Sequence, residues 1–164
     1  MKRLFYIFFS GILTVSSCQS DKKEAKDRQA PQAETPDVTA EAAKAPRLPW
    51  TAVANPESGK LELKEAPNSG SDLSAREVIE AANIKYPKIR LELQNIKGST
   101  AFVKIDDATY LTQQMGSAGA QAYLAEITYS LTQVGSIESV NFEFTEGDHA
   151  SPGVFTRESF AGFN

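Results

Sequence analysis

The chain contains a single histidine, His149, and it stands in a short segment whose residue types could move a proton. Gly147 and Asp148 precede it, and Pro152-Gly153 closes the segment. An imidazole exchanges protons near neutral pH, and a carboxylate can orient it or raise its pKa. Adjacent side chains of an extended chain point apart, so Asp148 is a poor orienting partner for His149. We expect a loop histidine that hydrogen-bonds backbone and closes a turn, with Gly147, Asp148 and His149 as the candidate binding loop.

Other patterns that support catalysis do not accompany this loop in the sequence. There is no Gly-x-Ser-x-Gly motif, no phosphate-binding loop and no second histidine. A serine or threonine nucleophile would therefore lack a recognisable activating group. The sequence predicts a protein without catalytic residues, and the alternative is a binder or hydrolase that uses Asp148 and His149.

Acidic residues are the remaining candidates for holding a cation. Asp106-Asp107 could gather with Glu126, Glu146 or Asp148. Calcium needs about six to eight oxygen ligands, and the spacing of these residues matches no EF-hand. Zinc needs nitrogen or sulfur ligands in a number that one histidine and one cysteine do not supply. The sequence therefore predicts neither a metal nor a cofactor.

The single cysteine, Cys18, indicates a role at a membrane. It follows Val15-Ser16-Ser17, and the apolar run Leu4–Val15 begins directly after two basic residues. This run has the length of the apolar part of a signal peptide and is too short to cross a bilayer core of about 30 Å as a helix. We expect residues 1–17 to be removed as a lipoprotein signal peptide and the Cys18 thiol to carry lipid.

Acyl chains on Cys18 would hold the protein on a membrane, because each buried CH₂ group contributes about 0.8 kcal/mol. This predicts a cell-envelope protein with an N-terminal lipid anchor, on the outer membrane if the host is Gram-negative. Two alternatives stay open: a secretory leader whose cysteine is incidental, and an uncleaved membrane anchor.

Composition divides the rest of the chain near residue 47. Residues 18–47 hold no aromatic residue and only Val38 among the large aliphatic ones, so they are expected to form a disordered tether. Residues 48–164 have enough apolar residues for a single domain. That domain carries nine Lys or Arg against fifteen Asp or Glu, a net charge near −6. Nucleic acid is therefore not an expected partner, because binding to phosphates requires clustered cations.

The first half of the domain predicts a hairpin followed by a helix. Short extended segments at 50–53 and 60–64 flank a turn that contains Pro and Gly. Ser74 and Glu77 have the spacing of a capping box, which marks the start of a helix. Pro87 should end that helix, because proline lacks the backbone N–H and clashes with the preceding turn.

A second pair of strands is expected next. Ile89, Leu91 and Leu93 alternate with polar residues, so they should line the buried face of a strand. Asn95–Gly98 should turn the chain back into a strand at 101–105, where Phe102 points to the opposite face.

The strongest helical periodicity in the chain follows these strands. Apolar residues recur with a spacing of three and four along one stripe, made of Ala120, Tyr123, Leu124, Ile127, Leu131 and Val134. Gly116-Ser117 should cap this helix at its start, and Gly135 should follow its last turn. A last strand is expected at 140–144.

The order β-β-α-β-β-α-β predicts an α+β fold with two helices packed on one face of a mostly antiparallel sheet. Aromatic residues remain without a place in this scheme: Tyr110, Phe155, Phe160 and Phe163. They are expected to pack on the core, with one or two of them joining Phe102 in an exposed apolar patch.

Residues from about 76 to 148 resemble a GerMN domain, a module of bacterial envelope lipoproteins. The resemblance rests on the strand Ala101–Ile105, the helix segment Ile127–Thr132, and Ile137–Phe142 followed by Gly147. It implies an envelope module without catalytic residues, of the kind that docks onto protein assemblies or builds rings.

Together these features predict a lipid-anchored envelope protein whose domain binds another envelope protein or associates with itself. The alternative is a cell-wall glycan or small-molecule binder or hydrolase that uses Asp148 and His149. A third hypothesis is a module that docks on peptidoglycan.

Overall fold

The computed structural model describes residues 47–67 and 72–163. Their elements, in chain order, are β1 (Trp50–Ala54), β2 (Leu61–Glu65), α2 (Ala75–Lys85), β3 (Leu91–Lys97), β4 (Thr100–Ile105), η1 (Tyr110–Gln114), α3 (Gly116–Leu131), β5 (Ser139–Glu143), β6 (Gly153–Phe155) and η2 (Arg157–Phe163). No described helix is both long and apolar enough to span a membrane. The predicted signal peptide, the lipidation of Cys18 and nearly all of the predicted tether lie outside the described residues.

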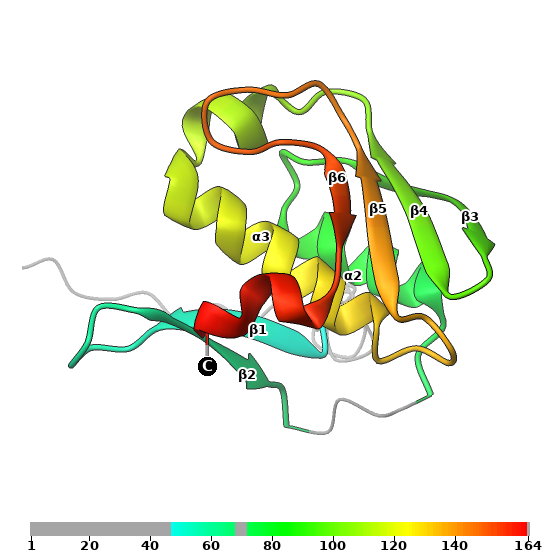
Figure 1. Cartoon of the computed structure of the whole chain (residues 1–164), viewed down its shortest axis with the longest axis horizontal. Helices are drawn as coiled ribbons and strands as arrows, with labels where there is room; N and C mark the ends of the chain where they lie inside the picture. The colour runs from blue at the N-terminus through cyan, green and yellow to red at the C-terminus, as the bar shows by residue number, and fades with distance from the viewer. Residues whose placement is uncertain (1–46, 68–71, 164) are drawn as a thin grey trace, which may run out of the picture. The chain divides into compact units, whose positions relative to one another are not determined.

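Two sheets make up the β structure. Strands β3 to β6 form a four-stranded sheet in the order β3-β4-β5-β6, and β1 and β2 form a separate pair (Figure 1). The pairs β3-β4 and β5-β6 are antiparallel, whereas β4 and β5 are parallel. A parallel pair needs a crossover, and α3 provides it between β4 and β5. The predicted α+β fold with a mostly antiparallel sheet is confirmed.

The predicted N-terminal hairpin is also confirmed, with β1 and β2 paired from Trp50↔Glu65 to Ala54↔Leu61. Its turn is fixed by the side chain of Asn55, whose Oδ1 accepts hydrogen bonds from the backbone N–H groups two and three residues further on. The hairpin does not join the four-stranded sheet. It packs on α3 instead.

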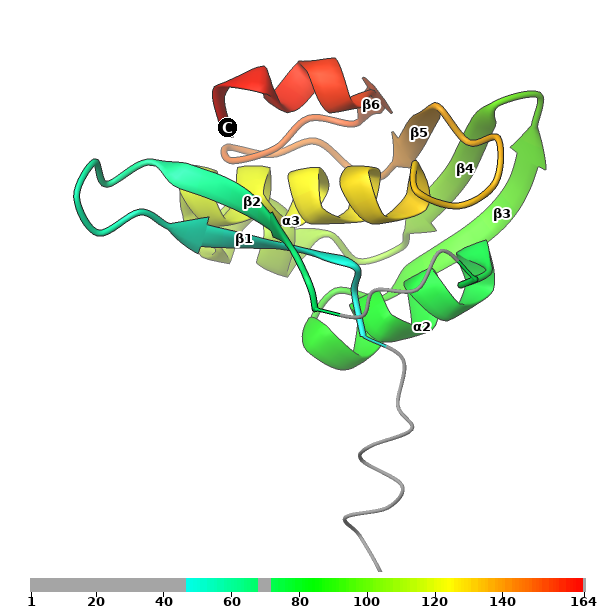
Figure 2. The same ribbon diagram turned by 90° about the horizontal axis from the view of Figure 1, so that it is seen from below.

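Helix α3 lies between this hairpin and the four-stranded sheet (Figure 2). The predicted stripe faces the core: five of its residues, Ala120, Tyr123, Leu124, Ile127 and Leu131, are buried, and Val134 is packed against them. The side toward the hairpin is buried as well, at Glu126 and Ser130. Both helices thus cover one face of the four-stranded sheet, as predicted, and the hairpin covers α3 from the other side.

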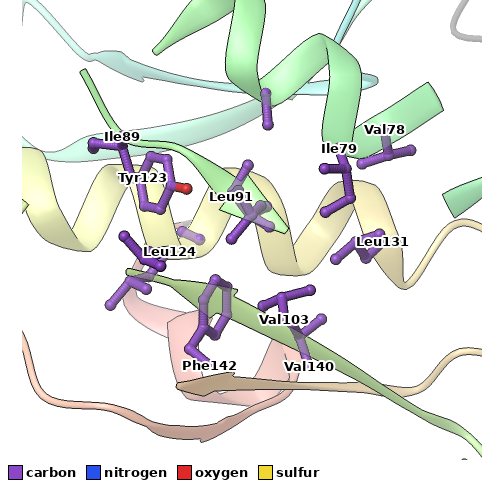
Figure 3. Close-up of a cluster of buried hydrophobic side chains, with 14 of the residues drawn as sticks. Val78, Ile79, Ile89, Leu91, Val103, Tyr123, Leu124, Leu131, Val140 and Phe142 are labelled. Carbon is purple, nitrogen blue, oxygen red and sulfur yellow. The ribbon is translucent and has the colours of Figure 1, made fainter. Parts of the chain in front are cut away.

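The core forms where α2, α3 and the sheet meet (Figure 3). Val78 from α2, Leu131 from α3, and Val103 and Phe142 from the sheet are each at most 1 % exposed. Burying a side chain of this size contributes about 1.5 to 3 kcal/mol. This packing fixes the position of the helices on the sheet.

Helix α2 begins and ends as its sequence predicts. The Ser74 hydroxyl accepts a hydrogen bond from the backbone N–H of Glu77, and the Glu77 carboxylate accepts one from the backbone N–H of Ser74. The helix ends at Lys85, two residues before Pro87. Local sequence therefore determined this element.

The turn between β3 and β4 is shorter and later than predicted. The pair Lys97↔Thr100 leaves only Gly98-Ser99 in the turn, and a bulge lies between Leu93 and Asn95. Gly98 adopts φ +57°, which suits the tight turn, so the predicted turn residues before it remain in the strand. The bulge adds one residue to β3 and thereby keeps Leu93 and Ile96 on the same face of the sheet.

The start of α3 also differs from its prediction. Its N-terminal residue Gly116 has φ +72°, and no side chain caps the helix. The π-helical turn η1 ends at Gln114, two residues before Gly116, so the chain enters α3 from another helical segment through Met115. The prediction that Gly116-Ser117 caps the helix is therefore wrong. Gly135 does take a positive φ, +55°, shortly after the helix.

The C-terminal segment forms β6 and η2, which the sequence did not predict. Its phenylalanines continue the core in a chain of ring contacts. Phe155 lies 5.7 Å from Phe142 and 5.7 Å from Phe160, and Phe160 lies 5.8 Å from Phe163, all between ring centroids. The expectation that these aromatic residues pack on the core is confirmed. The expectation that one or two of them join Phe102 in an exposed patch is wrong, because Phe155 and Phe163 are half-buried against the core and Phe160 lies within it.

Candidate functional site

The candidate binding loop Gly147–His149 lies against η1 and the start of α3. The backbone N–H of His149 donates a hydrogen bond of 3.0 Å to the carbonyl of Thr112, and the backbone N–H of Gly147 donates one of 3.1 Å to the carbonyl of Ala150. These bonds hold the turn through the backbone of the loop. Asp148 is exposed and His149 is half-buried.

Gly147 allows this loop to approach η1 closely. A Cβ atom at this position would lie 2.7 Å from Cβ and 2.8 Å from Oγ1 of Thr112, and it would also clash with the Gln113 side chain. Real Cβ atoms do not come so close to their neighbours. The glycine is therefore required by packing, independently of any role in binding.

The His149 ring contacts Ser117, a residue that the sequence suggested only as a helix cap. Nδ1 of His149 lies 3.2 Å from Oγ of Ser117, in the first turn of α3. A serine beside an imidazole is the start of a nucleophile and base pair, which a third group normally orients through the far ring nitrogen. In the described ranges, Nδ1 is the ring nitrogen with a hydrogen-bond partner. The contact joins residues 32 positions apart, so no local pattern could have found it.

The acidic residues considered as cation ligands are engaged separately. The Asp106 carboxylate lies 2.8 Å from Nζ of Lys104, and this contact raises the pKa of the lysine. Asp107 accepts a hydrogen bond from the backbone N–H of Thr109, and bonding to Thr109 lowers the pKa of that carboxyl. Over residues 47–67 and 72–163, no group of three or more His, Cys, Asp or Glu is placed to hold a metal ion.

Glu126 forms a buried polar cluster instead. It is 2 % exposed, and its carboxylate lies 2.7 Å from Nζ of Lys85. It also accepts hydrogen bonds of 2.7 Å from the Tyr86 hydroxyl and the backbone N–H of Ala52. Burial and the bond to Glu126 raise the pKa of Tyr86. The cluster ties β1, α2 and α3 together and satisfies a charge that would otherwise be costly to bury.

Arg157 makes a second set of contacts that connects the hairpin and α3. Its guanidinium lies 5.4 Å from the ring centroid of Trp50 and 4.9 Å from that of Tyr129. It also donates hydrogen bonds to Thr132 Oγ1 at 2.9 Å and to the Tyr129 carbonyl at 3.1 Å. A hollow of about 480 Å³ beside Arg157 is lined by Glu138 as well. Because all of these donors serve internal contacts, the arrangement positions the C-terminal segment.

The four-stranded sheet has a second face, which the described helices leave uncovered (Figure 2). Strand register places ten residues on this outer face: Glu92, Asn95, Lys97, Thr100, Phe102, Lys104, Ser139, Asn141, Glu143 and Val154. Phe102 lies in its central row with Asn95, Asn141 and Val154, and Val154 is 62 % exposed. Nζ of Lys97 lies 5.7 Å from the centroid of the Phe102 ring.

This outer face combines apolar, amide and charged side chains. Phe102, Val154 and the two amides form one row across the strands, with Val154 on the edge strand β6, and charged residues of both signs lie in the rows beside it. Protein interfaces commonly combine an aromatic centre with a polar rim. The sequence predicted that Phe102 points away from the core, and the strand register confirms it.

The comparisons with known proteins give a distant structural similarity. No protein-family model matches the chain, and no curated protein matches it. A solved structure, the tandem GerMN domains of the sporulation protein GerM from Bacillus subtilis, is similar over 67 % of this chain, with 14 % sequence identity and a TM-score of 0.43. The similar region spans 46 % of that structure, less than half of its length.

Proposed function

We propose that this protein is a lipid-anchored cell-envelope protein whose domain acts in protein docking or assembly without catalysing a reaction. The observation that carries the proposal is the outer face of the sheet, which no described helix covers and on which the strand register places the half-buried Phe102 and the exposed Val154. The sequence of residues 1–18 supports the membrane part of the proposal, because it has the pattern of a lipoprotein signal.

The Gly147–His149 loop supports a role without chemistry. Its backbone N–H groups and the imidazole are used for contacts that hold the loop to η1 and α3. Such contacts are typical of a structural histidine. Aromatic residues near the centre of an interface dominate the binding energy, so we expect Phe102 to contribute most to binding of a partner.

A second candidate function is a cell-wall glycan or small-molecule binder or hydrolase that uses Asp148 and His149. One observation favours it: Oγ of Ser117 lies 3.2 Å from Nδ1 of His149 at the start of a helix. This geometry would let the imidazole accept the serine proton if the neutral tautomer carries its hydrogen on Nε2.

Chemical crosslinking in intact cells, followed by mass spectrometry of the purified protein, separates the two functions. We expect a reproducible protein partner with the unchanged chain and with His149→Ala. We expect Phe102→Ser combined with Val154→Ser to reduce its recovery about tenfold or more, because both changes remove the apolar centre of the interface.

Ile84→Ser is the matched control, because Ile84 is 54 % exposed on α2, away from the outer face. It should leave the partner in place. The docking proposal would be wrong if His149→Ala abolished capture of the partner while the double serine variant retained capture. It would also be wrong if His149→Ala abolished an enzymatic activity that the double serine variant retained. In either case the second candidate function would replace it. Unfolding curves of all variants check that the fold is kept.

A further inference from the structure

We propose that a second copy of this chain pairs with the free edge of β3 and extends the four-stranded sheet across a two-fold axis. The inference rests on the proposed function, since it names a partner for the assembly role. Strand β3 is the first strand of its sheet, with β4 on one side and no described strand on the other. Such an edge presents backbone groups that another strand can bind.

Asn83 occupies one end of this edge. Its side-chain amide donates a hydrogen bond of 3.0 Å to the carbonyl of Leu91, and its Oδ1 accepts one of 2.8 Å from the backbone N–H of Leu91. Both backbone groups of Leu91 therefore point away from β4. The other end of the edge is the turn at Gly98-Ser99, where the chain leaves the strand. An added strand has to fit between Asn83 and this turn.

The positions that can bond such a strand follow from the orientation of Leu91. In an antiparallel pair, every second residue directs its backbone groups away from the neighbour, so Leu93 faces outward. The bulge between Leu93 and Asn95 inserts one residue, so the next outward position is Ile96. The segment available for pairing is therefore short, with Leu93 and Ile96 as its bonding residues.

These two positions define a register in which the edge is complementary to itself. Antiparallel pairing of two β3 strands around an axis between Gln94 and Asn95 places Leu93 opposite Ile96 of the second copy, and Ile96 opposite its Leu93. The same register places Glu92 opposite Lys97 of the second copy, and Lys97 opposite its Glu92. One register thus matches backbone bonds, apolar side chains and opposite charges together.

The side chains in this register are available for the contact. Ile96 is 46 % exposed, one of the few large apolar side chains exposed in the described ranges. Glu92 is 43 % exposed, and its ion pair with Arg90 is at the surface and therefore weak. Opposite charges and apolar pairs that face each other across two strands stabilise the strand pair.

The length of the β3 edge that is available for pairing is limited, which predicts weak and reversible association. The bulge and the Asn83 side chain prevent a long continuous ladder, as devices that protect edge strands do. Two copies held on one membrane would meet at high effective concentration, which compensates for weak pairing. The pairing therefore suits assembly at a membrane surface better than a permanent dimer.

Charge reversal tests the register. We would measure the sedimentation equilibrium of the full-length chain, extracted in mild detergent, over a range of concentrations. A dimer is expected, and Glu92→Lys or Lys97→Glu alone should raise its dissociation constant about tenfold or more, because two attractive pairs become repulsive. The double variant restores both pairs and should recover the dimer. Glu143→Lys, the same charge change in the same row of the outer face, is the control and should change little.

A photoreactive residue at Asn95 should also crosslink two copies, whereas one at Val154, on the opposite edge strand, should not. A double variant that stays monomeric, or equal crosslinking from both positions, would overturn the proposed register. A monomeric unchanged chain that still captures a protein through Phe102 would refute the self-pairing and leave the docking function standing. Failure of both would refute the docking function as well.

Discussion

At the scale of single residues, Gly147 illustrates a position where packing decides the amino acid. Changing Gly147 to Ala should lower the free energy of unfolding by about 1 to 3 kcal/mol, because the added methyl group overlaps Thr112. Urea unfolding followed by far-ultraviolet circular dichroism measures this change.

The matched control for this substitution is Gly162→Ala, where no heavy atom lies within 4 Å of the added Cβ. It should leave stability nearly unchanged. Equal effects of the two substitutions would show that the loop can move away from η1 and that Gly147 is not fixed by the close approach.

At the scale of elements, the start of α2 depends on one reciprocal pair of side chains. Ser74→Ala should cost about 1 kcal/mol of stability, because the cap of the helix is lost. Glu77 accepts bonds from the backbone and side chain of Ser74, and these bonds lower the pKa of its carboxyl. A lowered pKa in the folded state means that the carboxylate stabilises the fold above the unfolded pKa, near 4.5.

This contribution should be lost as the pH falls through the lower pKa of folded Glu77. Stability measured between neutral pH and about pH 3 should therefore decline less steeply in Glu77→Gln than in the unchanged chain. Glu80→Gln, an exposed change on the same helix, should keep the original slope. A steep decline retained in Glu77→Gln would exclude the capping box as its source.

At the scale of the whole described domain, polar contacts attach the hairpin to α3, beside the edge-on contact of Trp50 with Tyr129. The Glu126 carboxylate accepts the backbone N–H of Ala52, Ser130 accepts that of Trp50, and Gln133 accepts the Trp50 indole N–H. Few apolar side chains of the hairpin are buried, Leu63 among them. The hairpin should therefore open separately from the sheet.

Glu126→Gln should make this local opening measurable. The substitution removes the buried charge that faces Lys85, so the amide hydrogen of Ala52 should exchange about tenfold faster. The amide of Val103, in the interior of β4, serves as the control and should exchange at its original rate. Equal acceleration at both sites would show that the hairpin and the sheet unfold as one unit.

Much of the fold could be predicted from the sequence, because the patterns that specify its elements are local. The capping box of α2, the turn of the hairpin, the alternation in β4 and the apolar stripe of α3 each depend on residues close together in sequence. Element boundaries were missed where neighbouring structure intervened. The bulge in β3 and the entry into α3 from η1 are such places.

Local patterns in the sequence specify the types of the main elements, the core stripe and the outward direction of Phe102, because periodicity and turn chemistry act over a few residues. Which distant groups meet depends on the folded chain. It placed Glu126 against Lys85 and Ala52, Ser117 against His149, and β4 beside β5 in parallel. These contacts join residues far apart in the chain, and they form only because burial of the core brings α2, α3, the hairpin and the sheet together.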